Sequence, residues 1–267
     1  MNDHVARKRF GQNFLHDANT LARIIAAVAP QAGEHFVEIG PGQGALTKLL
    51  NSKCGRLDVI EIDRDLAAAL QQQDWATDVS IHQADALQFD FTALADDKAL
   101  PDTAPLRLVG NLPYNISTPL LFHILDQAHL FRDIHVMLQK EVVQRMVAGP
   151  GSRTYGRLSV SLAARCQIES LFTVKPGAFR PAPKVQSAFA RLIPLQTPRI
   201  PAAQWALFDE ILRSAFGQRR KQLGNALQQH LQPADIEQAG IDPAQRAEQL
   251  SIEHYAALTR VAMQRSG

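Results

Sequence analysis

A regular alternation of short apolar strands with helices is the feature that most constrains the fold of this 267-residue chain. Runs rich in β-branched and apolar residues predict strands, at 35–39, 56–62, 79–82, 106–110 and 134–138. Apolar residues at helical spacing predict helices, at 21–29, 45–50, 65–73 and 117–125. This alternation predicts an α/β fold in which helices cover both faces of a parallel sheet. Ligands of such folds bind beyond the carboxyl ends of the strands.

The second half of the chain predicts a different organisation. Residues 141–195 are rich in arginine and proline and predict two further helices and a β-hairpin. The segment 194–201 contains three prolines and predicts a linker. Helical patterns follow it, at 205–216, 221–230, 233–239 and 252–263. We therefore expect an α/β domain at 1–197, with an N-terminal segment preceding its first helix, and a small helical domain at 198–267.

The amino terminus, the hydropathy and the cysteines exclude several classes of protein. The charged start is not followed by the apolar stretch of a secretory signal. No apolar run approaches the roughly 20 residues of a membrane span. The two cysteines, Cys54 and Cys166, lie far apart and have no cysteine or histidine at metal-ligand spacing. The sequence therefore predicts a cytoplasmic protein that has neither a metal site nor a membrane contact.

A glycine-rich loop follows the first predicted strand of the sheet. Gly40, Gly42 and Gly44 stand between that strand and the next helix, where glycine lets the backbone turn sharply and approach a ligand. Glu61 lies at the end of the next strand, about 20 residues further on, which is the spacing of an acid that binds a ribose. Together the loop and the acid predict a cofactor that contains adenosine.

Charge distinguishes between two such cofactors. Glu38, Glu61 and Asp85 lie at the ends of consecutive predicted strands, and no lysine or arginine occurs between Glu38 and Thr47. Two like charges at ~4 Å repel by about 4 kcal/mol at an effective dielectric constant of 20, so these acids disfavour the pyrophosphate of NAD. They favour S-adenosylmethionine, which carries a sulfonium and an ammonium group. An NAD-dependent dehydrogenase is therefore the least favoured functional hypothesis.

The segment Asn111, Leu112, Pro113 and Tyr114 follows the fourth predicted strand. The exocyclic amine of adenine is a poor nucleophile because its lone pair is delocalised into the ring. The side-chain carbonyl of Asn111 and the backbone carbonyl of Leu112 can accept its hydrogens and make its nitrogen more tetrahedral. Tyr114 can stack on the base, which is worth about 1–3 kcal/mol. The segment predicts a site that methylates the adenine amine.

The order of several short motifs resembles that of the ribosomal RNA adenine N6-dimethyltransferase family, in particular of its bacterial members that act on 16S rRNA. The resemblance runs from about residue 7 to about residue 255. Its motifs start at Arg7, Glu38, Val59, Gln83, Asn111, Leu138, Tyr155, Phe179 and Phe216. It implies a Rossmann-like S-adenosylmethionine-dependent methyltransferase whose mostly parallel sheet has one antiparallel strand. It also implies dimethylation of two adjacent adenosines near the 3′ end of the RNA, in an assembling small subunit, by a monomeric enzyme.

The same resemblance implies roles for individual residues. It implies that Asn13 and Leu15 belong to an N-terminal segment that closes over the cofactor. Cofactor contacts are implied for Gly40, Glu61, Asp85 and Asn111, with Asn111 also close to the target amine. Phe179 matches an aromatic position that stacks on the other face of the flipped base. His16 departs from the small polar residue of the bacterial relatives, and its effect on the N-terminal segment stays open.

Basic residues are concentrated outside the first half of the predicted sheet. Residues 34–102 contain 13 acidic and 5 basic residues, whereas the rest of the chain contains 13 acidic and 23 basic ones. Lys184 lies in one stretch free of acids, and Arg219, Arg220 and Lys221 lie in another. These residues are predicted to bind RNA phosphates, which would make binding strongly dependent on salt. The target base would have to leave its stack.

Two alternatives stay open at this point. The glycine loop and the segment at Asn111 would also suit an adenine N6-methyltransferase that acts on 23S rRNA or on DNA. A non-catalytic ribosome assembly factor could use the same fold, although Asn111 and Asp85 argue for catalysis. The motifs at Phe179 and Phe216 favour the small-subunit RNA by resemblance.

Overall fold

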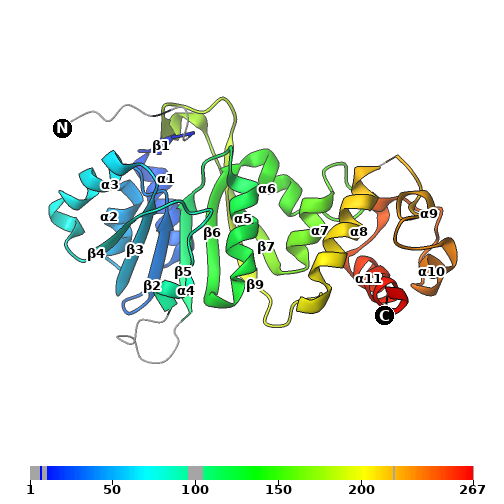
Figure 1. Ribbon diagram of the computed structural model, residues 1–267. Helices are drawn as coiled ribbons and strands as arrows, with labels where there is room; N and C mark the ends of the chain where they lie inside the picture. Colours follow the sequence, from blue (N-terminus) through cyan, green and yellow to red (C-terminus); the bar gives the residue numbers. More distant parts are fainter. Residues whose placement is uncertain (1–6, 8–10, 96–104, 219, 267) are drawn as a thin grey trace. The chain divides into compact units, whose positions relative to one another are not determined.

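The computed structural model describes residue 7 and residues 11–95, 105–218 and 220–266. The chain divides into two compact units (Figure 1). The first comprises residues 1–143 and 169–194, and the second comprises residues 144–168 and 195–267. Residues 144–168, which the predicted domain boundary assigns to the first domain, thus group with the C-terminal helices. The independent domains at 1–197 and 198–267 stay a prediction, because a compact unit need not fold alone.

A seven-stranded sheet forms the centre of the first unit (Figure 1). Its strands lie in the order β4 (Val79–Gln83), β3 (Arg56–Glu61), β2 (His35–Ile39), β5 (Leu106–Asn111), β6 (Phe131–Gln139), β9 (Ser187–Pro194) and β7 (Cys166–Val174). From β4 to β6 each strand is parallel to its neighbour, and β9 is antiparallel to β6. The predicted α/β fold with a mostly parallel sheet is confirmed. The parallel register brings the carboxyl ends of these strands to one edge.

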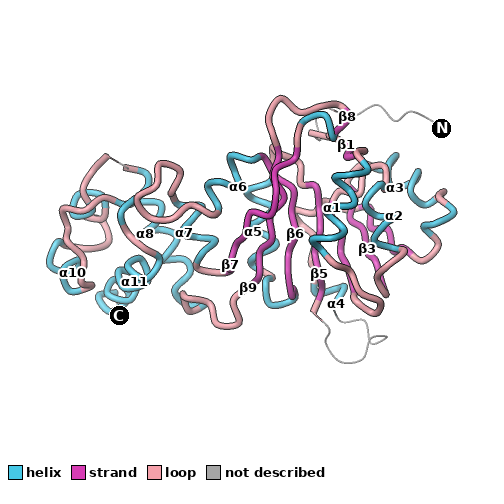
Figure 2. The backbone as a smooth tube through the Cα atoms, turned by 180° about the vertical axis from the view of Figure 1, so that it is seen from behind, coloured by secondary structure: helices cyan, strands magenta, loops and turns pink. Residues whose placement is uncertain are grey.

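Helices cover both faces of the sheet, as Figures 1 and 2 show from opposite sides. The helices α1 (Ala18–Val28) and α2 (Ala45–Asn51) pack apolar side chains against one face, and α5 (Ser117–Asp126) lies on the other. The remaining helices of this unit are α3 (Arg64–Gln71), α4 (Thr92–Ala95) and most of α6 (Lys140–Met146). The core between α1, α2 and the sheet includes Ile24, Leu50, Phe36, Val59 and Val109.

A buried ion pair network fixes the amino ends of several strands. Arg107, near the start of β5, is 5% exposed. Its guanidinium donates to both carboxylate oxygens of Asp133, each at 2.9 Å, to Glu34 at 2.7 Å and to the carbonyl oxygen of Val28 at 2.7 Å. Because all these partners are satisfied together, the charge of Arg107 is tolerated in the interior. The network joins β5 to β6, to the start of β2 and to the end of α1.

The N-terminal segment is held by a second sheet that sequence reasoning did not predict. The two-residue strand β1 (Phe14–Leu15) pairs antiparallel with β8 (Phe179–Arg180), so that Leu15 lies opposite Phe179. The backbone amide of His16 also donates to the carbonyl oxygen of Ala178 at 3.0 Å. Asp17 then caps α1 by accepting from the amide of Thr20 at 2.7 Å. Residues 11–15 are thereby fixed beside the carboxyl edge of the large sheet.

The second unit is helical and has a core of its own. It contains α7 (Arg157–Ala163), α8 (Trp205–Gly217), α9 (Leu223–Ala226), α10 (Pro233–Gln238) and α11 (Ile252–Ser266). Phe208, Leu212, Leu227 and Tyr255 are fully buried at its centre. Of the described helices in either unit, none combines the length and the apolar character that a membrane crossing needs.

The predicted helix at 221–230 is wrong in its extent. The observed helix α9 is a single turn, Leu223–Ala226. Gln222 is extended and forms a bridge with Arg246, and the amides of Leu223 and Gly224 donate to the carbonyl oxygens of Gln245 and Pro243 at 2.8 and 3.0 Å. These contacts with a distant segment replace the bonds that an earlier helical turn would need.

Candidate active site

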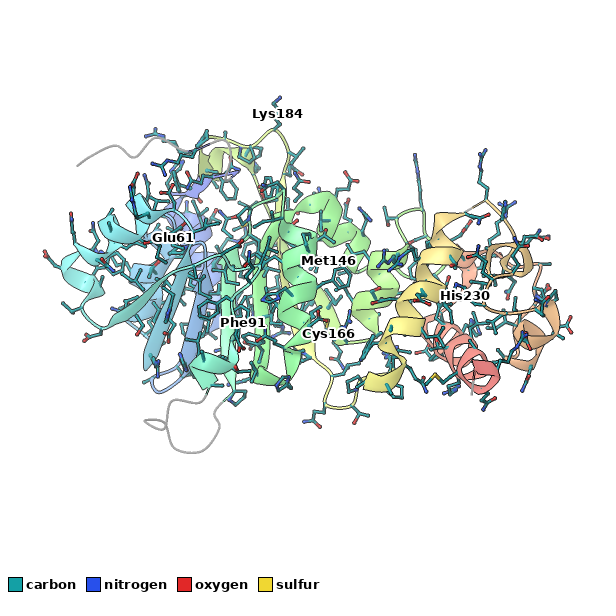
Figure 3. The ribbon with its side chains drawn as sticks, in the orientation of Figure 1. Glu61, Phe91, Met146, Cys166, Lys184 and His230 are labelled. Atoms are coloured by element: carbon teal, nitrogen blue, oxygen red, sulfur yellow. The ribbon has the colours of Figure 1, made fainter. Side chains whose placement is uncertain are left out.

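A cavity opens at the carboxyl edge of the parallel strands, between the glycine-rich loop and the N-terminal segment. All its lining residues come from the first unit. Most of the predicted site residues are among them: Asn13, Leu15, Gly40, Glu61, Asp85, Asn111, Leu112 and Tyr114. The predicted residues thus meet at one place, although their sequence positions span about 100 residues. Figure 3 labels Glu61 near the end of β3.

The glycine loop needs glycine for two reasons. Gly40 has a φ of +68°, a left-handed conformation that carries the chain out of β2 and around the cavity. At Gly42 a Cβ atom would lie 2.9 Å from the Cδ1 atom of Phe14. The N-terminal segment can therefore approach the loop closely only because Gly42 has no side chain.

Glu61 is held with its carboxylate fixed at the cavity wall. It is 5% exposed, and its Oε1 and Oε2 atoms accept from the amides of Asp63 at 2.9 Å and Gly42 at 3.3 Å. Burial raises the pKa of Glu61, and the two amide hydrogen bonds counteract this. Each oxygen retains a further acceptor position. The geometry leaves Glu61 able to accept hydrogen bonds from the hydroxyls of a ligand.

Glu38 lines the same cavity, but its side chain does not carry the negative charge that the sequence analysis expected of it. It is 3% exposed, and its Oε2 atom has no hydrogen-bond partner among the described residues. Burial raises the pKa of Glu38 to about 8, so this carboxyl is largely neutral at pH 7 in the protein without a ligand. The negative charge of the cavity at neutral pH is therefore smaller than three acids would give.

Asp85 lies beyond the end of β4 and is oriented by its own loop. Its Oδ1 atom accepts from the amide of Leu87 at 2.9 Å. The carboxylate is thereby fixed beside the cavity, with acceptor positions left for an amine or hydroxyl donor.

Asn111 ends β5 and joins the cavity to the N-terminal segment. Its Nδ2 atom donates to the carbonyl oxygen of Asn13 at 2.9 Å. Because the nitrogen side of the amide is used in this way, the Oδ1 atom is the group left to accept from a ligand. The amide of Leu112 donates to the carbonyl oxygen of Met137 at 3.1 Å, which fixes the next peptide. The segment therefore presents an acceptor in a defined orientation.

Tyr114 forms part of the wall beside Asn111. It is half-buried, and its hydroxyl makes a hydrogen bond of 2.6 Å with Ser187 Oγ at the start of β9. The hydroxyl of Ser117, at the start of α5, donates to the carbonyl oxygen of Tyr114 at 3.2 Å. The ring is therefore held both at its tip and at its backbone.

Other predicted residues lie away from the cavity. Phe179 is 3% exposed and packs in the core, so its ring is not part of the cavity wall. Lys184 is exposed, and Figure 3 shows its side chain pointing outwards. Arg220 and Lys221 are exposed in the second unit, while Arg219 lies outside the described residues. The role of Phe179 and the RNA contacts of these basic residues stay predictions.

Asp63 was assigned no role in the sequence analysis, but its side chain helps to hold the N-terminal segment beside the cavity. Its side chain is fully buried, caps α3 and accepts from Gln12 Nε2 at 3.1 Å and from Arg7 at 3.0 Å. The residue thus links the N-terminal segment to the start of α3, just beyond the end of β3 that carries Glu61. Because Asp63 lies two residues after Glu61, the sequence could have suggested that it has a structural role beside the cavity.

Comparison with known proteins agrees with the fold and the cavity. Residues 3–264 match the family model described as "Ribosomal RNA adenine dimethylase". A ribosomal RNA small subunit methyltransferase A from Aromatoleum aromaticum is 52% identical over 97% of this chain and 95% of its own length. The protein of the same name from Pseudomonas aeruginosa is 50% identical over 98% of this chain and 95% of its own length.

Solved structures share the fold at lower identity. A dimethyladenosine transferase from Plasmodium falciparum has a TM-score of 0.78 and 23% identity, covering 92% of this chain and 95% of its own. The 23S rRNA methyltransferase ErmE has a TM-score of 0.70 and 23% identity, covering 94% of this chain and all of its own. The architecture is therefore that of the Rossmann-like methyltransferases. The chain belongs to the ribosomal RNA adenine dimethylase family, and it is an rRNA adenine dimethyltransferase.

Proposed function

We propose that this protein transfers methyl groups from S-adenosylmethionine to N6 of two adjacent adenosines near the 3′ end of 16S rRNA, in the assembling small ribosomal subunit. The product is N6,N6-dimethyladenosine. The observation that carries the proposal is that Glu61, Asp85 and Asn111 line one cavity in a member of the rRNA adenine dimethylase family. The relatives named for the small subunit, at 50–52% identity, support the 16S target.

The residues around the cavity fit S-adenosylmethionine. Glu61 has acceptor positions left for ribose hydroxyls, and Asp85 has them for the adenine amine of the cofactor. The unpartnered Oε2 atom of Glu38 is a buried polar atom that a hydrogen-bonding group of a ligand would satisfy. Gly40 lines the cavity from the glycine-rich loop, and Asn13 and Leu15 line it from the N-terminal segment. The cofactor, when bound, supplies an electrophilic methyl group on a sulfonium.

The target amine is shaped by the segment after β5. Asn111 Oδ1 accepts one amine hydrogen and the carbonyl oxygen of Leu112 accepts the other, which directs the nitrogen lone pair out of the ring plane. Tyr114 stacks on one face of the adenine. Phe179 is the candidate for the other face, provided that its ring leaves the core on RNA binding. After transfer the nitrogen is cationic and acidic, so it loses a proton to water without a strong base.

The residues that line the cavity all belong to one unit of this chain. We further propose that the protein acts as a monomer, in the cytoplasm where ribosomal subunits assemble. Lys184 and the basic residues at 219–221 are the candidates for phosphate contacts outside the cavity.

The test is to incubate the protein with labelled S-adenosylmethionine and one of four substrates. These are 30S particles that lack the modification, naked 16S rRNA, 50S particles and DNA. We expect label in the 30S particles alone or most strongly there, at two adjacent adenosines, as N6,N6-dimethyladenosine. Label at another base, or preferentially in 50S particles or DNA, would contradict the proposal.

Replacement of Glu61 with alanine is expected to weaken cofactor binding by about 5- to 150-fold, which corresponds to roughly 1–3 kcal/mol for lost hydrogen bonds to a charged group. Isothermal titration with S-adenosylhomocysteine measures the Kd. Glu61→Gln, which retains one oxygen, should lose less. Glu141→Ala, an exposed glutamate outside the cavity, is the matched control. An unchanged Kd for Glu61→Ala would remove Glu61 from the site.

The double variant Arg220→Ala/Lys221→Ala is expected to weaken binding to 30S particles and to reduce its salt dependence. Each phosphate contact that is lost should lower the slope of log K against log salt concentration by about 0.7–0.9. The control is Lys48→Ala/Lys53→Ala, which removes two exposed lysines from the acidic part of the chain. Equal slopes for the two double variants would exclude a specific contact at 220–221.

A further inference from the structure

The hydrogen bond between Tyr114 and Ser187 connects two segments that are 73 positions apart in the chain. Ser187 is 0% exposed and is the first residue of β9, where it lies opposite Gln139 of β6. Tyr114 lies after β5 and lines the cavity. The tip of a cavity-lining ring is thus attached to a buried position at the carboxyl end of β6, where β9 begins.

The start of β9 is well fixed around Ser187. The amide of Lys140 donates to the carbonyl oxygen of Gln186 at 2.9 Å, and Lys140 Nζ donates to Gln186 Oε1 at the same distance. The register of β6 and β9 then continues from Gln139 and Ser187 to Ile134 and Leu192. Ser187 therefore has little freedom to follow a movement of Tyr114.

Packing does not enclose Tyr114 completely. The residue is half-buried and lines the cavity, so part of its surface faces the space that a ligand would enter. A phenylalanine in this place would offer the same stacking surface but could rotate away. A hydroxyl that bonds to a buried partner restricts the rotation of the ring and loses that energy if the ring turns.

We propose that Ser187 is a positioning residue for the target adenine, because its hydroxyl holds the ring of Tyr114 in the orientation that stacks on the base beside Asn111. The inference rests on the proposed function, since it requires that an adenine enters this cavity. Ser187 itself is buried behind Tyr114 and contacts neither the base nor the cofactor. It acts only through the ring.

The same connection links the cavity to the exposed loop that precedes β9. Ser187 follows Lys184 by three residues, and Lys184, Val185 and Gln186 are all exposed. A phosphate contact at Lys184 would therefore lie close, along the chain, to the residue that orients the base. Recognition of the backbone and placement of the base would then depend on one short segment.

The test measures methyl transfer to unmodified 30S particles by wild type, Ser187→Ala, Tyr114→Phe and the double variant. Many phosphate contacts hold the RNA, so the Kd for particles and the Kd for cofactor should stay within about twofold of the wild type. The single-turnover rate at saturating substrates should fall by about five- to tenfold in Ser187→Ala, the effect of one hydrogen bond. Tyr114→Phe should show the same loss, and the double variant should lose no more than either.

Ser161→Ala is the matched control, because Ser161 is also fully buried and its hydroxyl has no partner among the described residues. It should transfer methyl groups at the wild-type rate. A wild-type rate in Ser187→Ala, or losses that add in the double variant, would overturn the inference. The inference would also be overturned if Ser187→Ala lost cofactor affinity and thermal stability together with its rate, because that would indicate a general structural role. Absence of transfer by the wild type would instead contradict the proposed function.

Discussion

Replacement of Asn111 with alanine is expected to lower the rate of methyl transfer to 30S particles by at least a hundred- to thousandfold, while the protein still binds its cofactor. The expected loss of rate is the one seen when an enzyme loses a single oriented group that stabilises a developing charge. Asn111 is comparable, because its side chain acts directly on the reacting nitrogen. In the variant the amine has no side-chain acceptor, and its lone pair stays delocalised in the adenine ring. Single-turnover assays with labelled cofactor measure the rate.

Cofactor affinity separates this role from a structural one. Asn111 also donates to the carbonyl oxygen of Asn13, so its loss should weaken cofactor binding by up to about tenfold, the effect of one hydrogen bond. The control is Asn115→Ala, an exposed asparagine in the same loop, which should transfer at the wild-type rate. If transfer and cofactor affinity fell by the same factor in Asn111→Ala, Asn111 would serve cofactor binding alone.

Replacement of Glu38 with glutamine is expected to make the protein without cofactor more stable than the wild type at alkaline pH. Burial raises the pKa of Glu38 from 4.5 to about 8, so the folded protein keeps this proton when the unfolded chain has lost it. Between these two values the unfolded state binds fewer protons, and stability falls by about 1.4 kcal/mol per pH unit. The stability that the protonated Glu38 side chain gives the folded protein is therefore fully present below pH 4.5 and is lost by about pH 8.

Glutamine has a similar shape and no charge to bury, so it lacks this dependence. The free energies of unfolding of the two proteins should therefore diverge by on the order of 4 kcal/mol from pH 5 to pH 8.5. Urea denaturation at a series of pH values measures this difference. Glu237→Gln, at an exposed position, serves as the control and should follow the wild type. Parallel curves for wild type and Glu38→Gln would mean that the carboxyl is not desolvated.

Local pattern was sufficient to predict the five parallel strands of the sheet, because each such strand of an α/β fold has a continuous apolar run and a turn at its end. The strand at 35–39 was predicted with its observed bounds. The pairing of Leu15 with Phe179 was not predicted, since two-residue strands have no periodicity. The helix at 221–230 was predicted too long; at its start this is because Gln222 pairs with the distant Arg246, which helical propensity cannot indicate.

In the candidate site, too, the features with a local sequence pattern could be predicted and those that depend on distant contacts could not. Gly40, Glu61, Asp85 and Asn111 could be chosen from sequence because each lies at or just beyond the end of a strand, and these strands end at one edge of the sheet. The near-neutral state of Glu38 depends on burial by residues from several elements. The burial of Phe179 and the Ser187 contact depend on tertiary packing too. Such properties are set by the assembled core and have no local signature in the sequence.

The most direct test of the account is a crystal structure of the protein with S-adenosylmethionine bound. We expect the ribose hydroxyls to lie within hydrogen-bond distance of Glu61, the adenine amine of the cofactor to contact Asp85, and the methyl group to face Asn111. A cofactor bound outside the carboxyl edge of β2, β3, β4 and β5 would contradict it. So would a cofactor in this cavity whose methyl group points away from Asn111.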